Sequence, residues 1–165
     1  MRGCCSTLGL PLGPAFGPMV HAIGEGLRQD RRADVQAACQ ILIDTLVSGY
    51  RVPPARVRVM ATRPADGAGE LHGLYEPEDE GTVARISVWM RTTQKKNVVA
   101  FKTFLRTLIH ELCHHLDYEL FALEETFHTE GFYKRESSLV GALLAQFAAD
   151  SAAHSDSPPR ETTEQ

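Results

Sequence analysis

The sequence predicts an α+β fold in which a small three-stranded sheet, mixed or antiparallel, packs against helices. Two observations support this fold class. Segments with the apolar spacing of helices stand at both ends of the predicted domain, and three short segments with strand character lie between them. The expected order of elements is therefore helix, three strands, helix, helix, and no internal repeat interrupts it.

A single domain is expected from the length and the composition. The 165 residues are enough for one hydrophobic core, and a content of 43% hydrophobic and 23% charged residues is typical of a globular protein. We place this domain at residues 20–150. Residues 1–19 are rich in Gly and Pro and predict a flexible segment, whereas residues 151–165 are polar with two adjacent prolines and predict a disordered tail.

Charge and cysteine content narrow the function classes. The formal net charge of −4 disfavours a main role in binding nucleic acid. Basic residues near strand ends, such as Arg56, Arg58 and Arg91, leave that role as a weakly supported alternative. The cysteines form no CxxC pair, so a reducing cytoplasm is the expected location. The chain has no apolar run of about 18 residues, so we expect no contact with a membrane.

The first predicted helix spans residues 34–50. Apolar residues recur there at helical spacing, and Gly49, Pro53 and Pro54 end the helix. The residues of the apolar face are Val35, Ala38, Ile41, Leu42, Leu46 and Val47.

Three strands are expected at residues 56–62, 69–77 and 83–91. In the first and the third, apolar residues alternate with basic or polar ones, which is the period of a strand with one buried face. The acidic segment EPEDEG predicts a turn between the second and the third. We expect the third strand to offer a sheet edge to an extended substrate, with Trp89 lining a pocket.

Two helices complete the prediction, at residues 98–120 and 132–149. One face of the first of them is apolar and should pack in the core. The residues of that face are Leu105, Leu108, Ile109, Leu112, Cys113, Leu116 and Leu120.

The opposite face of the 98–120 helix carries the pattern H-E-x-x-H. His110 and His114 are four residues apart, so both imidazoles project from one side and can hold the same ion. Glu111 points about a quarter turn away, where it can reach a water molecule on that ion without being a ligand. The sequence therefore predicts a metal site with an adjacent general base.

A catalytic zinc site needs a third protein ligand, since the fourth position is left to water. Asp117 is better placed to accept a proton from the second nitrogen of a ligand histidine. His128 is our preferred third ligand, because it follows a reversal of the chain and imidazole is a favoured zinc donor. The candidates as a set are Asp117, Glu124, Glu125, His128, Glu130 and Glu136.

The segments LIHELCHHLDY and FHTEGFYKRESSL, with ARISVWMR upstream, resemble the SprT-like group of minimal zinc metallopeptidases. In that group H-E-x-x-H is followed by a later H-x-x-x-F segment, which His128 and Phe132 match here. The resemblance implies a zincin-like fold with H-E-x-x-H on the central helix, and zinc held by His110, His114 and His128. It also implies that Glu111 is the general base.

These features predict a zinc metallopeptidase that hydrolyses peptide bonds in a protein or peptide substrate, with Glu111 as the catalytic base. The developing oxyanion needs a hydrogen-bond donor, and Tyr133, next to the third ligand, is the best-placed candidate. His115, Tyr118 and Arg135 are the others. The alternative is a zinc-stabilised module without catalysis, which recognises a peptide or nucleic acid.

Overall fold

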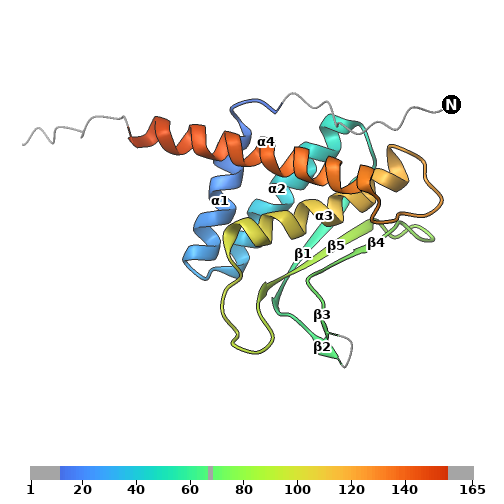
Figure 1. Ribbon diagram of the computed structural model, residues 1–165, viewed down its shortest axis with the longest axis horizontal. Coiled ribbons are helices and arrows are strands. Elements are labelled where there is room, and N and C mark those ends of the chain that lie inside the picture. Colours follow the sequence, from blue (N-terminus) through green and yellow to red (C-terminus); the bar gives the residue numbers. More distant parts are fainter. Residues whose placement is uncertain (1–11, 67–68, 156–165) are drawn as a thin grey trace, which may run out of the picture.

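The computed structural model describes residues 12–66 and 69–155 (Figure 1). Four helices and a three-stranded mixed sheet confirm the α+β class in this part of the chain. The elements are α1 (Phe16–Arg28), α2 (Arg32–Tyr50), β1 (Ala55–Thr62), β2 (Ala65–Asp66), β3 (Gly69–Glu70), β4 (Gly73–Glu76), β5 (Ala84–Arg91), α3 (Phe101–Glu119) and α4 (Glu130–Ser155).

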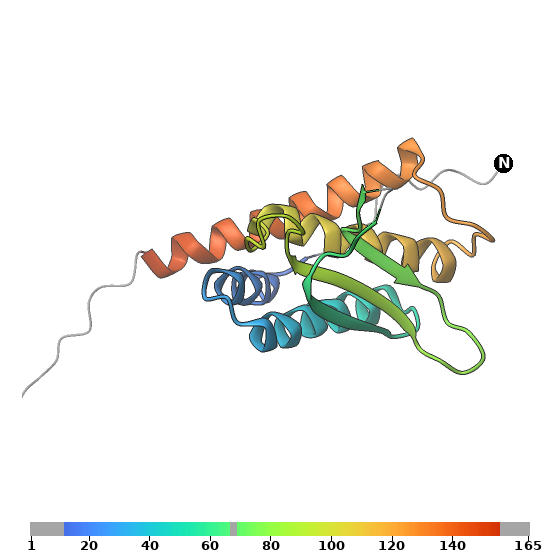
Figure 2. The ribbon, with the colours of Figure 1, turned by 90° about the horizontal axis from the view of Figure 1, so that it is seen from below.

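The main sheet has the strand order β1-β5-β4, so β5 runs between the other two (Figure 2). β1 is parallel to β5, and β4 is antiparallel to it with Gly73 opposite Val88. The expectation that the 83–91 strand forms a sheet edge is therefore wrong. Both of its edges are paired, and Trp89 is only 9% exposed. The edge next to α3 belongs to β4.

The single strand expected at 69–77 is divided in the structure. Its first part, β3, pairs with β2 in a small separate hairpin, and its second part is β4. Glu70 explains the division, because its carboxylate accepts the backbone N–H of Thr93 at 2.9 Å and pairs with Arg63 at 3.2 Å. These contacts hold the hairpin beside the end of β5, so β4 begins only after His72.

α3 lies between α4 and the sheet, in contact with β4 and β5 (Figure 1). Its apolar face is buried as the sequence predicts, except that Leu120, just beyond the helix, is 39% exposed. Ile41 of α2 also differs from its prediction, since it is 54% exposed. The buried side chains of the strands and all four helices form one core.

The helices at the ends reach further than the sequence predicts. α1 begins at Phe16, inside the segment expected to be flexible, and buries Phe16, Val20 and Ile23. A Cβ at Gly17 would lie 2.7 Å from Cβ of Asp150, so this glycine permits close packing of α1 on α4. α4 continues to Ser155, five residues into the expected tail. Residues 1–11 and 156–165 lie outside the described part.

The free edge of β1 is covered by side chains of α2. The amide of Gln36 donates to the carbonyl of Val57 at 2.8 Å and accepts the N–H of Val59 at 2.7 Å. The amide of Gln40 donates to the carbonyl of Ala55 at 3.1 Å and accepts the N–H of Val57 at 2.8 Å. Four residues of helix rise about 6 Å and two residues of strand about 6.6 Å, so the two amides match the strand spacing.

Candidate metal centre

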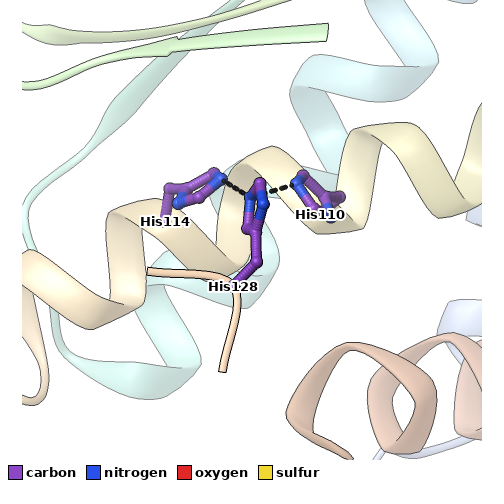
Figure 3. A group of neighbouring side chains, drawn as sticks. All are labelled: His110, His114 and His128. Atoms are coloured by element: carbon purple, nitrogen blue, oxygen red, sulfur yellow. Dashed lines mark hydrogen bonds between the residues drawn. The ribbon is translucent and has the colours of Figure 1, made fainter. Parts of the chain in front are cut away.

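Three histidine side chains meet beside α3 (Figure 3). His110 and His114 project from one side of the helix, and His128 comes from the segment between α3 and α4. Nε2 of His128 lies 3.0 Å from Nε2 of His110 and 3.0 Å from Nε2 of His114. All three ligand atoms lie within 4.8 Å of one another, so the three histidines can hold one metal ion.

The far side of the His110 ring is held by α4. Nδ1 of His110 lies 2.7 Å from Oε2 of Glu136, and Nη1 of Arg106 donates to the other carboxylate oxygen at 2.7 Å. A carboxylate accepts hydrogen bonds, so Nδ1 of His110 carries the proton and Nε2 presents a lone pair to the other two histidines.

The His114 ring is held through a hydroxyl group. Oγ1 of Thr126 donates to Oδ2 of Asp117 at 2.8 Å, and it lies 2.8 Å from Nδ1 of His114. Because the hydroxyl proton of Thr126 is donated to Asp117, Oγ1 of Thr126 accepts the proton on Nδ1 of His114. Nε2 of His114 is then left with a lone pair. Asp117 thus contacts His114 through Thr126, not directly as the sequence analysis expected.

The other candidates for the third ligand are occupied elsewhere or remote. Asp117 is 1% exposed and also accepts from Arg135. Glu136 accepts from His110 and Arg106. Glu130 pairs with Lys134 at 2.6 Å on the surface of α4. Glu124 and Glu125 are exposed and do not belong to the group that can hold a metal.

One buried aromatic ring supports all three imidazoles. Phe132 is 0% exposed, and its ring centroid lies 4.9 Å from His110, 4.7 Å from His114 and 5.1 Å from His128. It stands four residues after His128, at the start of α4. The packing of α4 against α3 therefore fixes the rings as well as their hydrogen bonds.

The donor set suits a divalent transition metal. Metal–nitrogen bonds of about 2.0–2.1 Å place tetrahedral ligand atoms roughly 3.3 Å apart, so small ring movements suffice to admit an ion. Burial, with smaller contributions from the charges of His110 and His128, lowers the pKa of His114 to about 4. His114 is therefore unprotonated at neutral pH, as a metal ligand must be.

Glu111 lies beside the histidines and is 6% exposed. Burial raises the pKa of its carboxyl group to about 7, with a smaller contribution from the negative charge of Glu136. Carboxyl groups with this property accept and release protons near neutral pH.

A cavity of about 640 Å³ opens over these side chains. His110, Glu111, His114 and His128 all line it, together with residues of β4 on the opposite wall. Tyr118 and Tyr133 also line it, and Tyr133 is 49% exposed. Trp89 is not among the lining residues of this cavity, contrary to the expectation that it lines the substrate pocket.

Two of the four candidate oxyanion donors lie away from the cavity. His115 is fully buried between the hydroxyl of Tyr75 at 2.9 Å and the carbonyl of Pro53 at 2.8 Å. Arg135 is buried, bonds to Asp117 and lies 4.9 Å over the Phe121 ring. Tyr133 and Tyr118 remain as candidates.

Two basic residues near the strand ends are engaged in ion pairs. Arg91 pairs with Asp30, and Arg63 pairs with Glu70. Arg56 and Arg58 are exposed on β1, on the face opposite to Val57 and Val59.

Comparison with family models, curated proteins and solved structures found no match for this chain. Among the described helices, none has the length and apolar character needed to cross a membrane. The geometry of the site therefore carries the functional argument.

Proposed function

We propose that the protein is a zinc-dependent metallopeptidase of the SprT-like, zincin type. The observation that carries this proposal is the convergence of three Nε2 atoms in a cavity that also contains the buried carboxyl group of Glu111. Three histidines leave a fourth position open, which distinguishes a catalytic zinc site from a purely structural one.

Zinc is the proposed metal because imidazole nitrogen is a favoured donor and three such ligands are a known catalytic set. When bound, zinc polarises a carbonyl group and lowers the pKa of a water molecule. The protein supplies the orientation: Glu136 and Thr126 hold the Nδ1 protons, so that the lone pairs of His110 and His114 face inward.

Glu111 is the proposed catalytic base. Its carboxylate takes a proton from the attacking water and passes it to the leaving amine of the cleaved peptide bond. Tyr133 is the proposed donor to the developing oxyanion, because its ring lies 5.9 Å from the His128 ring and lines the cavity. Tyr118 is the second candidate, but its ring stacks on Tyr75 at 5.9 Å.

The substrate is proposed to be an extended segment of a protein or peptide, bound along β4. Within the described residues β4 ends the sheet and lines the cavity, whereas the other edge, on β1, is covered by glutamines of α2. An extended chain can add to a free strand edge through main-chain hydrogen bonds. Nucleic acid is a weaker candidate, supported only by exposed residues such as Arg56 and Arg58.

The alternative is a module that uses the metal for folding and binds a peptide or nucleic acid without cleaving it. Glu111 favours catalysis over this alternative. Burial of an ionisable carboxyl group next to three histidines is costly, and a structural site has no use for it.

The test is a matched pair of measurements on the wild type and Glu111→Gln. Zinc is measured per chain by plasma mass spectrometry, and cleavage is measured on an unfolded protein such as reduced casein. We expect one zinc ion per chain in both, and a fall in turnover of about 10²-fold or more in the variant. Bound zinc with equal turnover in both, or with none in either, argues against the proposal.

A further inference from the structure

β4 and α3 pack in register over the proposed site. The strand pairing places Gly73 and Tyr75 on the face that meets α3, opposite Val88 and Ile86 of β5. Two strand residues span about 6.6 Å and four helix residues about 6 Å, so positions 73 and 75 lie over positions 111 and 115. Each of these pairs is in direct contact.

The first pair is a glycine against the proposed base. A Cβ at position 73 would lie 2.9 Å from Cδ and 2.9 Å from Cγ of Glu111, and it would meet Oε1 still more closely. Real Cβ contacts are essentially never shorter than 3.0 Å. Any side chain at position 73 therefore forces the Glu111 carboxylate, the strand, or both to move.

The second pair fixes the separation between strand and helix. The carbonyl of Pro53 accepts from Nε2 of His115 at 2.8 Å, so Nε2 carries a proton. Nδ1 of His115 lies at hydrogen-bond distance, 2.9 Å, from the hydroxyl of Tyr75. Because His115 is fully buried, this bond ties β4 to α3 one helical turn beyond Glu111.

We propose that Gly73 is a positioning residue for Glu111. Because Gly73 has no side chain, the Glu111 carboxylate has room beside the histidines. The Tyr75–His115 hydrogen bond keeps the separation between β4 and α3 fixed. Gly73 acts through Glu111 and does not touch the substrate's reacting atoms in this scheme. The kinetic part of the inference rests on the proposed peptidase function.

The kinetic test is Gly73→Ala, with Gly141→Ala as the matched control. Gly141 lies on the surface of α4, where an added Cβ meets nothing within 4 Å. We expect Gly73→Ala to keep one zinc per chain but to lose about 10²-fold in kcat, with KM changed by less than about threefold. Gly141→Ala should match the wild type. An unchanged kcat in Gly73→Ala, with the wild type active, overturns the inference and leaves the peptidase proposal intact.

A second test does not depend on activity. Thermal unfolding is followed for the metal-free wild type, Gly73→Ala, Glu111→Ala and the double variant. Truncation of Glu111 removes the three atoms nearest to the new methyl group, so the loss in Tm caused by Gly73→Ala should at least halve in the Glu111→Ala background.

If Gly73→Ala lowers Tm equally in the wild type and in Glu111→Ala, the inference is overturned, whatever the enzyme assay shows. If Gly73→Ala does not fold, folding of the double variant supports the contact, and failure of both contradicts it. If the wild type cleaves no substrate, the function proposal fails, while the four unfolding curves still decide whether Gly73 makes room for Glu111.

Discussion

Nδ1 of His110 lies 2.7 Å from the carboxylate of Glu136, a residue of a different helix 26 positions further along the chain. Since this carboxylate also accepts from Arg106, it is fixed from two sides and holds the His110 ring with its lone pair directed at His114 and His128. Glu136, the partner of a proposed metal ligand, is therefore held as firmly in the site as His110 itself.

Replacement of Glu136 by Gln should weaken metal binding by about 10- to 100-fold, because a neutral amide holds the Nδ1 proton of His110 less firmly. Competition with a chromophoric chelator measures the zinc affinity. Glu130→Gln is the control, since Glu130 is exposed and pairs only with Lys134. Equal affinities in the wild type and Glu136→Gln would remove Glu136 from the site.

Replacement of Thr126 by Val should lower the zinc affinity by about tenfold, because His114 loses its hydrogen-bond acceptor while the volume of the side chain stays similar. Thr126→Ser restores the hydroxyl group and should bind zinc like the wild type. The same chelator competition applies. If the serine variant is as weak as the valine variant, the hydroxyl bridge to Asp117 is not the cause.

Metal removal should lower thermal stability, because a bound ion would tie His128, in the segment between α3 and α4, to His110 and His114 of α3. At a zinc concentration 1,000 times Kd, binding adds about 4 kcal/mol to the free energy of unfolding. We expect Tm of the wild type to fall on addition of a chelator, and Tm of His128→Ala to change far less. A chelator effect of equal size in both would place the metal elsewhere.

The metal-free protein should depend on pH through Glu111. Burial raises the pKa of this carboxyl group from 4.5 to about 7 in the folded state, so the folded state binds the proton more tightly than the unfolded state. The resulting stabilisation is complete below about pH 4.5 and is lost as the pH rises through about 7. Its full size is up to about 3 kcal/mol.

Glu111→Gln lacks this titration and should gain stability relative to the wild type between pH 5 and pH 8. Urea unfolding in the presence of a chelator measures the difference. The His114 pKa, lowered to about 4, works in the opposite direction, since its contribution grows as the pH rises from 4 to 6.5, but it is common to both proteins. Parallel pH curves would show that Glu111 does not titrate in this range.

Replacement of both Gln36 and Gln40 by Ala should expose the backbone of β1. Four hydrogen bonds are lost, each with a net value of about 1 kcal/mol, and the edge becomes free to pair with another chain. We expect concentration-dependent dimers or larger species in light scattering. Gln94→Ala, in an exposed loop, is the control. A monomeric double variant at high concentration would show that the glutamines do not protect this edge.

Local spacing was enough to predict the parts of the site that depend on one helix. His110, Glu111 and His114 follow from the helical period, and the structure brings His128 to them as the sequence suggested. The roles of Glu136 and Thr126 could not be predicted in this way, because they arise only when α4 and the preceding segment pack on α3. No sequence period encodes such a contact.

The sequence pattern also could not predict the order of the strands in the sheet. Alternation in β5 predicts one buried face, but the structure places β5 between two neighbours and buries residues of both its faces, Ser87 and Trp89 included. The sequence analysis missed α1, whose start lies in the Gly- and Pro-rich segment expected to be flexible, although Phe16, Val20, Ile23 and Leu27 are spaced as in a helix and all are buried. In this helix Gly17 serves close packing against α4 instead.

The glutamine side chains of α2 leave the sheet with one edge at which another strand can pair. Within the described part of the chain, Gln36 and Gln40 bond to the backbone of β1, and β4 is the strand whose outer edge is unpaired. Polymerisation by strand pairing needs two free sheet edges on every copy, whereas the described part of this molecule offers one. Pairing at β4 would therefore end after one added strand and would not continue into a fibre.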